Sequence, residues 1–224
     1  MDFERQRKAL ARSLEAQGLL RSESVKRAFL RVPRELFVWP GTEDDAYADI
    51  PLPLGDTGQT ISAPHMVVIM LEEMRLSLGD TVLEVGAGSG YNAALMAEIV
   101  AGKDSQKRGR VVTVERLPEL AAFARGNIAR AGYSDVVEVV LGDGTLGYPP
   151  NAEDNYDHIM VTAAAPHIPV ALKRQLRVGG TLLIPLGPPG YQDLIRLTKL
   201  SPQDYREENL GGCVFVPLVG EDGY

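Results

Sequence analysis

The fold of this chain is decided by one stretch, Glu84-Val85-Gly86-Ala87-Gly88-Ser89-Gly90. It stands between an apolar strand-like run, residues 81–83, and an alanine-rich helix-like run, residues 91–97. A strand, a tight turn and a helix in this order bring a ligand against the backbone at the carboxyl end of the strand. The three glycines allow backbone conformations and close approaches that a Cβ atom would obstruct. The stretch therefore predicts an α/β fold with a ligand site at this turn.

The spacing of these glycines argues against a dinucleotide ligand. A dinucleotide fingerprint has glycines at the first, third and sixth positions of the turn, and the sixth position counted from Gly86 is Tyr91. The acidic Glu84 at the strand end would also repel a nearby phosphate. We therefore expect a ligand without phosphate.

The rest of the chain supports the same fold class. From residue 81 onward, strand-like and helical runs alternate, as in a parallel sheet that is covered on both faces. We expect a Rossmann-like, doubly wound, mainly parallel seven-stranded α/β sheet with helices on both faces and an N-terminal helical extension. The later strands are expected at residues 156–162, 180–186, 194–200 and 213–219, and further helices at residues 3–17, 24–30, 64–76 and 169–176.

We expect a single domain over residues 1–224. Residues 1–76 would form its N-terminal helical and substrate-side extension, and residues 77–224 its ligand-binding α/β core. Within the extension, residues 35–60 are rich in Pro, Gly and Asp, and a connection of this length is usually functional or disordered. Residues 102–109 are polar and are expected to form a surface loop.

The composition argues against several classes of function. The formal charge of −7 disfavours a broad nucleic-acid-binding face, because such faces depend on Lys and Arg. The single cysteine, Cys213, rules out an internal disulfide, and the three scattered histidines lack the spacing of metal ligands, so no metal is expected. The sequence has neither a signal peptide nor an apolar span of about 18 residues. A soluble cytoplasmic protein, away from membranes, is the expectation.

Glu84 and its glycine turn resemble the first motif of the class I S-adenosylmethionine-dependent methyltransferases. The resemblance implies S-adenosyl-L-methionine as cofactor and S-adenosyl-L-homocysteine as its product. Two more acids follow strand-like runs: Glu115, where such folds bind ribose hydroxyls, and Asp143, suited to accept a bond from the adenine amino group. Either acid alone has a simpler interpretation as a solvated turn residue. Their shared position at strand ends favours a common site.

Base methylation is disfavoured. Many methyltransferases that act on nucleobase amino groups have an Asn/Asp-Pro-Pro-aromatic motif after the fourth strand, where this chain has Thr162-Ala163-Ala164-Ala165-Pro166. Cytosine C5 chemistry needs an activated thiolate, and Cys213 lies in a strand-like apolar run that favours a buried structural thiol.

A second motif, Gln59-Thr60-Ile61-Ser62-Ala63-Pro64-His65-Met66, narrows the family. Together with residues 32–38, 83–91, 142–144 and 215–218, it makes the chain resemble the protein-L-isoaspartate O-methyltransferases along nearly its whole length. The resemblance implies methylation of the free α-carboxylate of L-isoaspartyl, and also of D-aspartyl, residues in damaged proteins and peptides. It also implies an exchanged order of the last strands relative to other methyltransferases. A monomer is expected.

The chemistry of that reaction assigns a role to Ser62. A peptide α-carboxylate has a pKa of about 3.3–3.7, so it is ionised at neutral pH and needs no general base. What it needs is a donor that orients it, and Ser62 lies just before Pro64 at an expected helix start, where an anion is favoured. The simpler alternative makes Ser62 a helix N-cap.

By this resemblance, Ser62 is the catalytic candidate, and Ser62, His65 and Val214 are the substrate-binding candidates. His65 has an equally good interpretation as an exposed residue at a helix start. The cofactor-binding candidates are Thr60, Ile61, Ser62, Glu84, Gly86, Gly88, Gly90, Glu115, Asp143 and Gly144. Two alternatives stay open: another small-molecule or nucleic-acid methyltransferase, and a noncatalytic S-adenosylmethionine-binding module. The turn at residues 55–58 is one residue longer than the resemblance predicts, which leaves the geometry of the substrate-side loop open.

Overall fold

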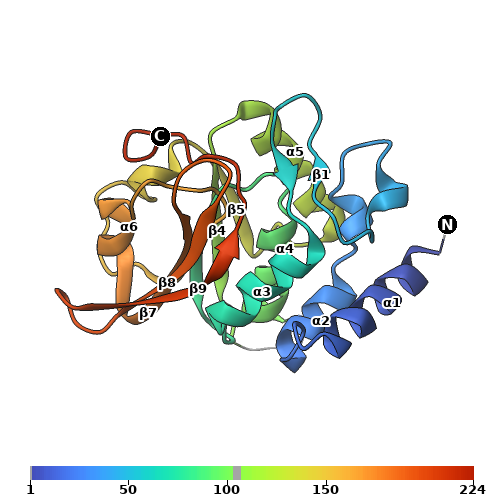
Figure 1. The fold of residues 1–224 in the computed structure, drawn as a ribbon, viewed down its shortest axis with the longest axis horizontal. Helices are drawn as coiled ribbons and strands as arrows, with labels where there is room; N and C mark the ends of the chain where they lie inside the picture. Colours follow the sequence, from blue (N-terminus) through green and yellow to red (C-terminus); the bar gives the residue numbers. More distant parts are fainter. Residues whose placement is uncertain (1, 103–106) are drawn as a thin grey trace.

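The computed structural model describes residues 2–102 and 107–224, so residues 103–106 of the expected surface loop lie outside the described residues. The described chain forms a seven-stranded sheet with the strand order β5-β4-β3-β6-β7-β8-β9 (Figure 1). Its strands are β3 (Thr81–Val85), β4 (Arg110–Glu115), β5 (Val137–Leu141), β6 (Tyr156–Val161), β7 (Leu176–Leu186), β8 (Gln192–Lys199) and β9 (Tyr205–Cys213). Strands β3 to β7 are parallel, and β8 and β9 are each antiparallel to the strand before. The predicted Rossmann-like sheet is confirmed.

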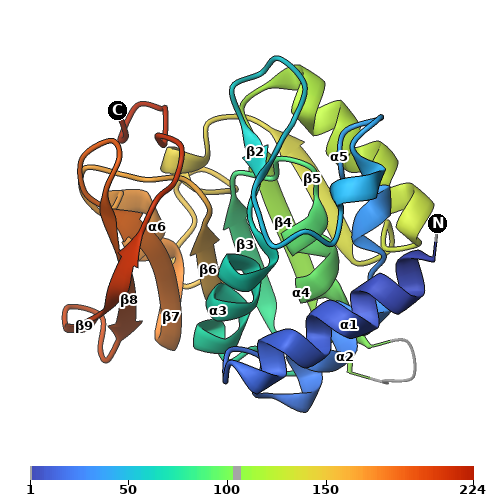
Figure 2. The same ribbon diagram turned by 45° about the vertical axis from the view of Figure 1, so that its right-hand side comes forward.

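Helices cover both faces of the sheet, because buried residues alternate along its strands. Val82 of β3 belongs to a core shared with α1 (Phe3–Ala16), α2 (Glu23–Arg31), α3 (Pro64–Met74), α4 (Tyr91–Ala101) and α5 (Pro118–Ala131). Leu83, its neighbour in β3, belongs to a second core on the opposite face with α6 (Val170–Gln175). Figure 2 shows α3, α4 and the two N-terminal helices stacked together on one side of the sheet.

The expected last strand, residues 213–219, is wrong. Strand β9 ends at Cys213, and the chain beyond it makes only an isolated bridge between Pro217 and Ala164. The apolar run from Val214 to Val216 resembles a strand in sequence, but the real edge strand is the polar run before it, whose charged side chains face solvent. Charged residues are common on edge strands because they discourage pairing with other chains. Strand β7 also begins earlier than expected, at Leu176, directly after α6.

The N-terminal extension is helical and then irregular. Helix α1 is capped by Asp2, and the chain leaves it at Gly18, which has a φ of +72°. After α2 come two short 3-10 helices, η1 (Arg34–Leu36) and η2 (Glu43–Asp45), and a hairpin of β1 (Leu52–Pro53) with β2 (Thr60–Ile61). The extension therefore delivers residues 59–62 to the sheet just before α3 begins. In the described part of the chain, no helix has the length and apolar character to cross a membrane.

Candidate active site

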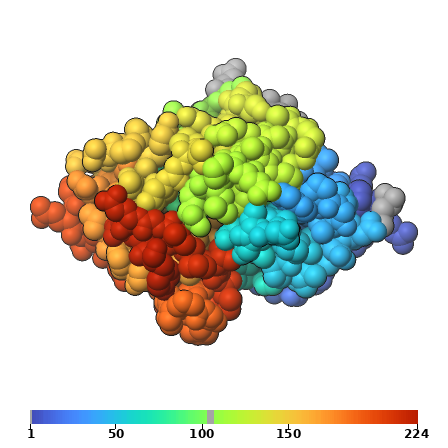
Figure 3. Space-filling view, turned by 90° about the horizontal axis from the view of Figure 1, so that it is seen from above, coloured from blue at the N-terminus to red at the C-terminus, as the bar shows by residue number. Residues whose placement is uncertain are grey.

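A cavity of about 230 Å³ lies at the carboxyl ends of β3, β4 and β6. Strand β3 is the point where the chain order of the sheet reverses, and ligands of open α/β sheets bind at such points. Two walls line the cavity. We call residues 84–89, 114–117, 144 and 162–163 the sheet wall, and residues 59–62 and 216–219 the loop wall. In Figure 3 the red C-terminal segment and the cyan segment around residue 60 meet at the centre of this end of the molecule.

The glycine turn brings backbone to the cavity surface. Gly86 has a φ of +98°, and a Cβ atom there would lie 2.4 Å from Thr162 Oγ1. Thr162 fixes the turn, because its hydroxyl donates to the carbonyl oxygen of Gly86 at 2.7 Å. Gly88 also lines the cavity, whereas Gly90 is the N-cap of α4 behind it, where a Cβ would press on Ile128.

Glu84 is a buried carboxylate with an unsatisfied oxygen. Its side chain is 0% exposed, and Oε2 accepts a hydrogen bond of 2.5 Å from Thr113 Oγ1. Oε1 has no hydrogen-bond partner among the residues that the structure describes. Burial raises the pKa of Glu84 to about 8. Because an unpaired buried carboxylate is costly, the site fits a cationic or hydrogen-bond-donating ligand at Oε1.

Glu115, the last residue of β4, ties two turns together. Its Oε2 accepts from Gly88 N at 3.0 Å, and its Oε1 accepts from Leu117 N at 3.0 Å. Each carboxylate oxygen has a second lone pair, so a ligand hydroxyl can still bind while both amide bonds persist. The structure thus places Glu84 and Glu115 on one wall, as their strand ends predict.

Asp143 is oriented differently. It does not line the cavity, although the next residue, Gly144, does. Its Oδ1 accepts from the backbone and hydroxyl of Thr145, at 2.9 and 2.7 Å, and its Oδ2 accepts from Glu221 N at 2.7 Å. Asp143 therefore anchors the chain that follows the loop wall.

A second acid completes this anchor. Asp222 Oδ1 lies 2.7 Å from His167 Nε2, and its Oδ2 accepts from Val170 N at 2.8 Å. The backbone N–H of Asp222 donates to Thr145 Oγ1 at 3.1 Å. We call residues 220–222 and these partners the C-terminal anchor. It holds the end of residues 216–219 against the sheet.

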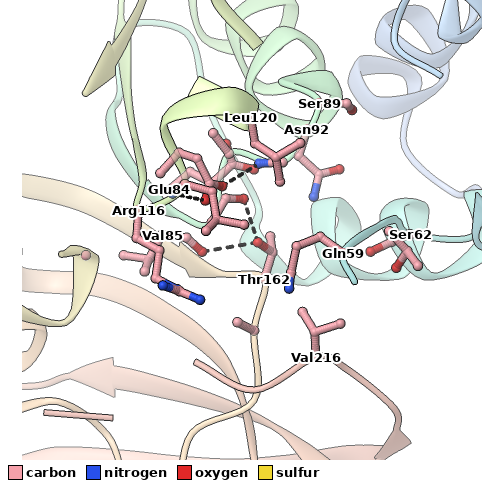
Figure 4. A pocket seen from close by; sticks show the side chains of 18 of the residues that line it. Gln59, Ser62, Glu84, Val85, Ser89, Asn92, Arg116, Leu120, Thr162 and Val216 are labelled. Atoms are coloured by element: carbon pink, nitrogen blue, oxygen red, sulfur yellow. Dashed lines mark hydrogen bonds between the residues drawn. The ribbon is translucent and has the colours of Figure 1, made fainter. Parts of the chain in front are cut away.

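Thr60, Ile61 and Ser62, predicted to border the cofactor, all line the cavity. The alternative that Ser62 caps α3 is wrong, because the N-cap is Ala63 and no side chain makes a capping bond there. The Ser62 hydroxyl is thus not committed to the helix end. In Figure 4 Gln59 lies between Thr162 and Ser62, and Val216 lies below them.

Two predicted substrate residues lie outside the cavity lining. His65 is in the first turn of α3, and its backbone N–H and its Nδ1 lie 2.8 and 3.0 Å from Asp49 Oδ1. Val214 is 70% exposed, and its neighbour Val216 lines the cavity in its place.

Sequence reasoning missed Arg34. This arginine is fully buried and donates to the carbonyl oxygen of Ser62 at 2.9 Å. The only signal was a charged residue among the apolar ones of residues 32–38, which is too weak to identify a buried role. Cys213 is buried as expected, and burial raises its pKa to about 11, as for an inert thiol.

The chain matches known proteins over nearly its whole length. The family described as protein-L-isoaspartate(D-aspartate) O-methyltransferase (PCMT) matches residues 5–223. A protein-L-isoaspartate O-methyltransferase of Staphylothermus marinus is 51% identical over 222 residues, which is 99% of this chain and 97% of the relative. One of Hyperthermus butylicus is 53% identical over 224 residues, covering 99% and 92%. A Plasmodium falciparum crystal structure, described as such an enzyme in complex with S-adenosyl-L-homocysteine, is 28% identical, covers 95% of this chain and 97% of that one, and has a TM-score of 0.82.

Proposed function

Because the chain belongs to the protein-L-isoaspartate(D-aspartate) O-methyltransferase family, we propose that it methylates isoaspartyl residues. The methyl group of S-adenosyl-L-methionine passes to the free α-carboxylate of L-isoaspartyl residues, and also to the side-chain carboxylate of D-aspartyl residues, in damaged proteins and peptides. The next backbone nitrogen then attacks the methyl ester and expels methanol to form a succinimide, whose hydrolysis returns some normal aspartyl linkage. The observation that carries the proposal is the cavity itself, in which an acidic sheet wall faces a loop wall that includes Ser62.

The residues of the sheet wall fit this cofactor. The glycine turn adopts at Gly86 a conformation in which a Cβ would strike Thr162 Oγ1, and Glu84 Oε1 is a buried acceptor in need of a donor. S-adenosyl-L-methionine carries an ammonium and a sulfonium but no phosphate, and it supplies the electrophilic methyl group when bound. Glu84 would hold its cationic part and Glu115 its ribose hydroxyls, while Gly86 and Gly88 admit it to the backbone.

The remaining cofactor contacts are proposed in the same way. Thr60, Ile61 and Gly144 line the cavity and would border the cofactor. Gly90 would act by shaping the turn from behind. Asp143 would reach an adenine amino group with the lone pairs that Thr145 and Glu221 leave free.

Ser62 would orient the substrate. Its hydroxyl donates to the ionised α-carboxylate, which therefore needs no proton removed before it reacts. Methyl transfer is a displacement at carbon. The protein mainly has to align the carboxylate oxygen with the methyl carbon at roughly 3–3.5 Å and to exclude water. Residues 59–62 and 216–219 cover the cavity opposite the sheet. The loop wall would therefore border both the methyl donor and the substrate carboxylate.

The substrate chain would extend from the cavity over the exposed surface beside it. Val214, which precedes the loop wall, would contact this chain through its backbone and side chain. His65, held by Asp49 at the start of α3, would contact it on the other side. We further propose a cytoplasmic monomer that does not engage nucleic acid or membranes.

Methyl incorporation into a matched pair of peptides tests the function. One peptide carries an isoaspartyl linkage, and its twin carries a normal aspartyl linkage at the same position. With radiolabelled S-adenosylmethionine, we expect ester formation in the isoaspartyl peptide alone. Cofactor binding without transfer to either peptide would indicate a noncatalytic module, and transfer to a small molecule or to RNA would indicate a different methyltransferase.

A further inference from the structure

Arg34 is a buried cation beside the cavity. It begins η1, directly after Pro33, and its side chain is 0% exposed. Burial lowers its pKa to about 10, so the guanidinium is still charged at neutral pH. A buried charge is costly unless its hydrogen bonds are well made. The Arg34 guanidinium is therefore expected to make specific hydrogen bonds inside the protein.

The guanidinium joins three segments that are distant in sequence. Its Nε donates to the carbonyl oxygen of Ala46 at 2.8 Å, and its Nη2 donates to that of Ser62 at 2.9 Å. Its Cζ lies 5.1 Å from the ring centroid of Tyr91, the first residue of α4 after the glycine turn. One planar group thus connects the irregular extension, the loop wall and the helix behind the sheet wall.

Arg34 is itself fixed from behind. Its backbone N–H donates to the Tyr47 hydroxyl at 3.2 Å, and that hydroxyl donates to the Glu35 carboxylate. Arg7 of α1 donates to Tyr47 at 2.7 Å and to Glu35 at 2.9 Å. The network leaves the Arg34 backbone little freedom, so the position of its guanidinium is set by the fold.

We propose that Arg34 is a positioning residue for Ser62. By holding the Ser62 carbonyl oxygen it fixes the peptide plane after Ser62, which sets where the hydroxyl points. Among the residues that the structure describes, no other side chain hydrogen-bonds the Ser62 backbone, and α3 begins at Pro64 without a side-chain cap. The inference rests on the proposed function, because it assigns Arg34 a role through the catalytic hydroxyl.

Arg34→Lys tests the role while keeping the charge. A single ammonium cannot replace a planar fork that reaches two carbonyl oxygens. We expect the kcat for an isoaspartyl peptide to fall by about tenfold or more, while the Kd of S-adenosyl-L-homocysteine, measured by calorimetry, changes by less than about twofold. Arg196→Lys is a matched control. Arg196 is also buried, paired with Glu73 at 2.6 Å, and lies outside the cavity lining, so that variant should keep its kcat.

A double-mutant cycle separates positioning from general destabilisation. If Arg34 acts through the Ser62 hydroxyl, Arg34→Lys should have almost no further effect on kcat in a Ser62→Ala background. Additive effects of the two substitutions, or an unchanged kcat in Arg34→Lys alone, would overturn the role. If Arg34→Lys does not fold, Arg34→Gln, which keeps two neutral N–H donors, enters the same cycle. A wild-type chain inactive on the peptide would overturn the function and this role together, whereas an active wild type with additive effects overturns the role alone.

Discussion

The two walls of the cavity are built in opposite ways. The sheet wall consists of turns that directly follow the parallel strands β3, β4, β5 and β6, and Glu84 and Glu115 lie within the strands themselves. The loop wall comes from two short segments outside the main sheet, more than 150 residues apart, which hydrogen bonds from Arg34 and from the C-terminal anchor hold in place. The sheet supports one wall along its length, whereas a few side chains support the other.

This difference predicts different kinds of failure. Damage to the sheet wall should abolish ligand binding, because the wall is rigid and cannot adapt. Damage to the loop wall should leave the ligand bound and slow the reaction, because the misplaced groups are those that face the substrate. Substitutions in each wall test this separation.

Gly86→Ala should have the largest effect. A residue with a Cβ must adopt a φ of +98° there and contact Thr162 Oγ1 at 2.4 Å. We expect the affinity for S-adenosylhomocysteine to fall by at least about a hundredfold, or about 2.7 kcal/mol, in calorimetric titration. Gly132→Ala is the control, since its φ is +80° but nothing lies within 4 Å of the added Cβ. Wild-type affinity in Gly86→Ala would show that the sheet wall adapts after all.

Ser62→Ala tests the loop wall. A lost hydrogen bond to a charged group is worth about 1.5–3 kcal/mol, so kcat for an isoaspartyl peptide should fall by about tenfold to over a hundredfold. Calorimetry should find the affinity for S-adenosylhomocysteine nearly intact. An unchanged rate would remove Ser62 from the mechanism, and a parallel loss of affinity would break the division between the walls.

Glu115→Ala returns to the sheet wall with a milder change. It removes the acceptor of Gly88 N and Leu117 N and the proposed ribose contact. We expect an affinity for S-adenosylhomocysteine about tenfold lower, consistent with one charge-assisted hydrogen bond. Glu119→Ala, an exposed acid in the first turn of α5, should bind like the wild type. Equal affinities for both variants would exclude Glu115 from the cofactor site.

Glu84 gives the sheet wall a pH dependence. Burial raises its pKa from 4.5 to about 8, so the ligand-free protein holds a proton there at neutral pH. A cationic ligand favours the ionised form of Glu84, so binding at pH 7 should release close to one proton. Calorimetry should detect this proton, because the measured binding heat will then depend on the ionisation enthalpy of the buffer. Glu84→Gln should abolish that dependence, and a wild type without it would contradict the assignment.

The same shift predicts a change in stability. Because the folded pKa of Glu84 lies above the unfolded value, its contribution to the stability of the ligand-free protein is complete below about pH 4.5 and is lost as the pH rises toward 8. Thermal unfolding at several pH values should show a flatter profile for Glu84→Gln.

Asp222→Asn, in the C-terminal anchor, should have the smallest effect. The hydrogen bond from His167 lowers the pKa of Asp222, and pairs this exposed are worth about 0–1 kcal/mol. We expect Tm to fall by no more than about 2–4 °C at pH 7. Because the pKa of Asp222 is lower in the folded than in the unfolded protein, its ionised form stabilises the fold at neutral pH, and this stabilisation is lost in acid. The difference in Tm between Asp222→Asn and the wild type should therefore vanish below about pH 3.8. A large loss of ligand affinity would show that the anchor controls the sheet wall too.

The same contrast explains what could be predicted from the sequence. Glu84 and Glu115 were placed correctly because parallel strands bring their carboxyl ends to one edge, which is a local rule. Asp143 obeys that rule for its backbone, but its carboxylate turns to Glu221, a partner 78 residues later. The polar strand β9 was missed because its residues lack an apolar alternation. Arg34 was missed because its partners are backbone carbonyls, which no residue pattern records.

The return of residues 214–219 over the sheet has a consequence for biosynthesis. A nascent chain that has emerged from the ribosome through Cys213 already exposes every strand of the seven-stranded sheet, while residues 216–219 of the loop wall have still to emerge. The protein can thus build its scaffold during translation while the cavity stays open on that side. Methyl transfer would then have to wait until residues 216–219 have also emerged.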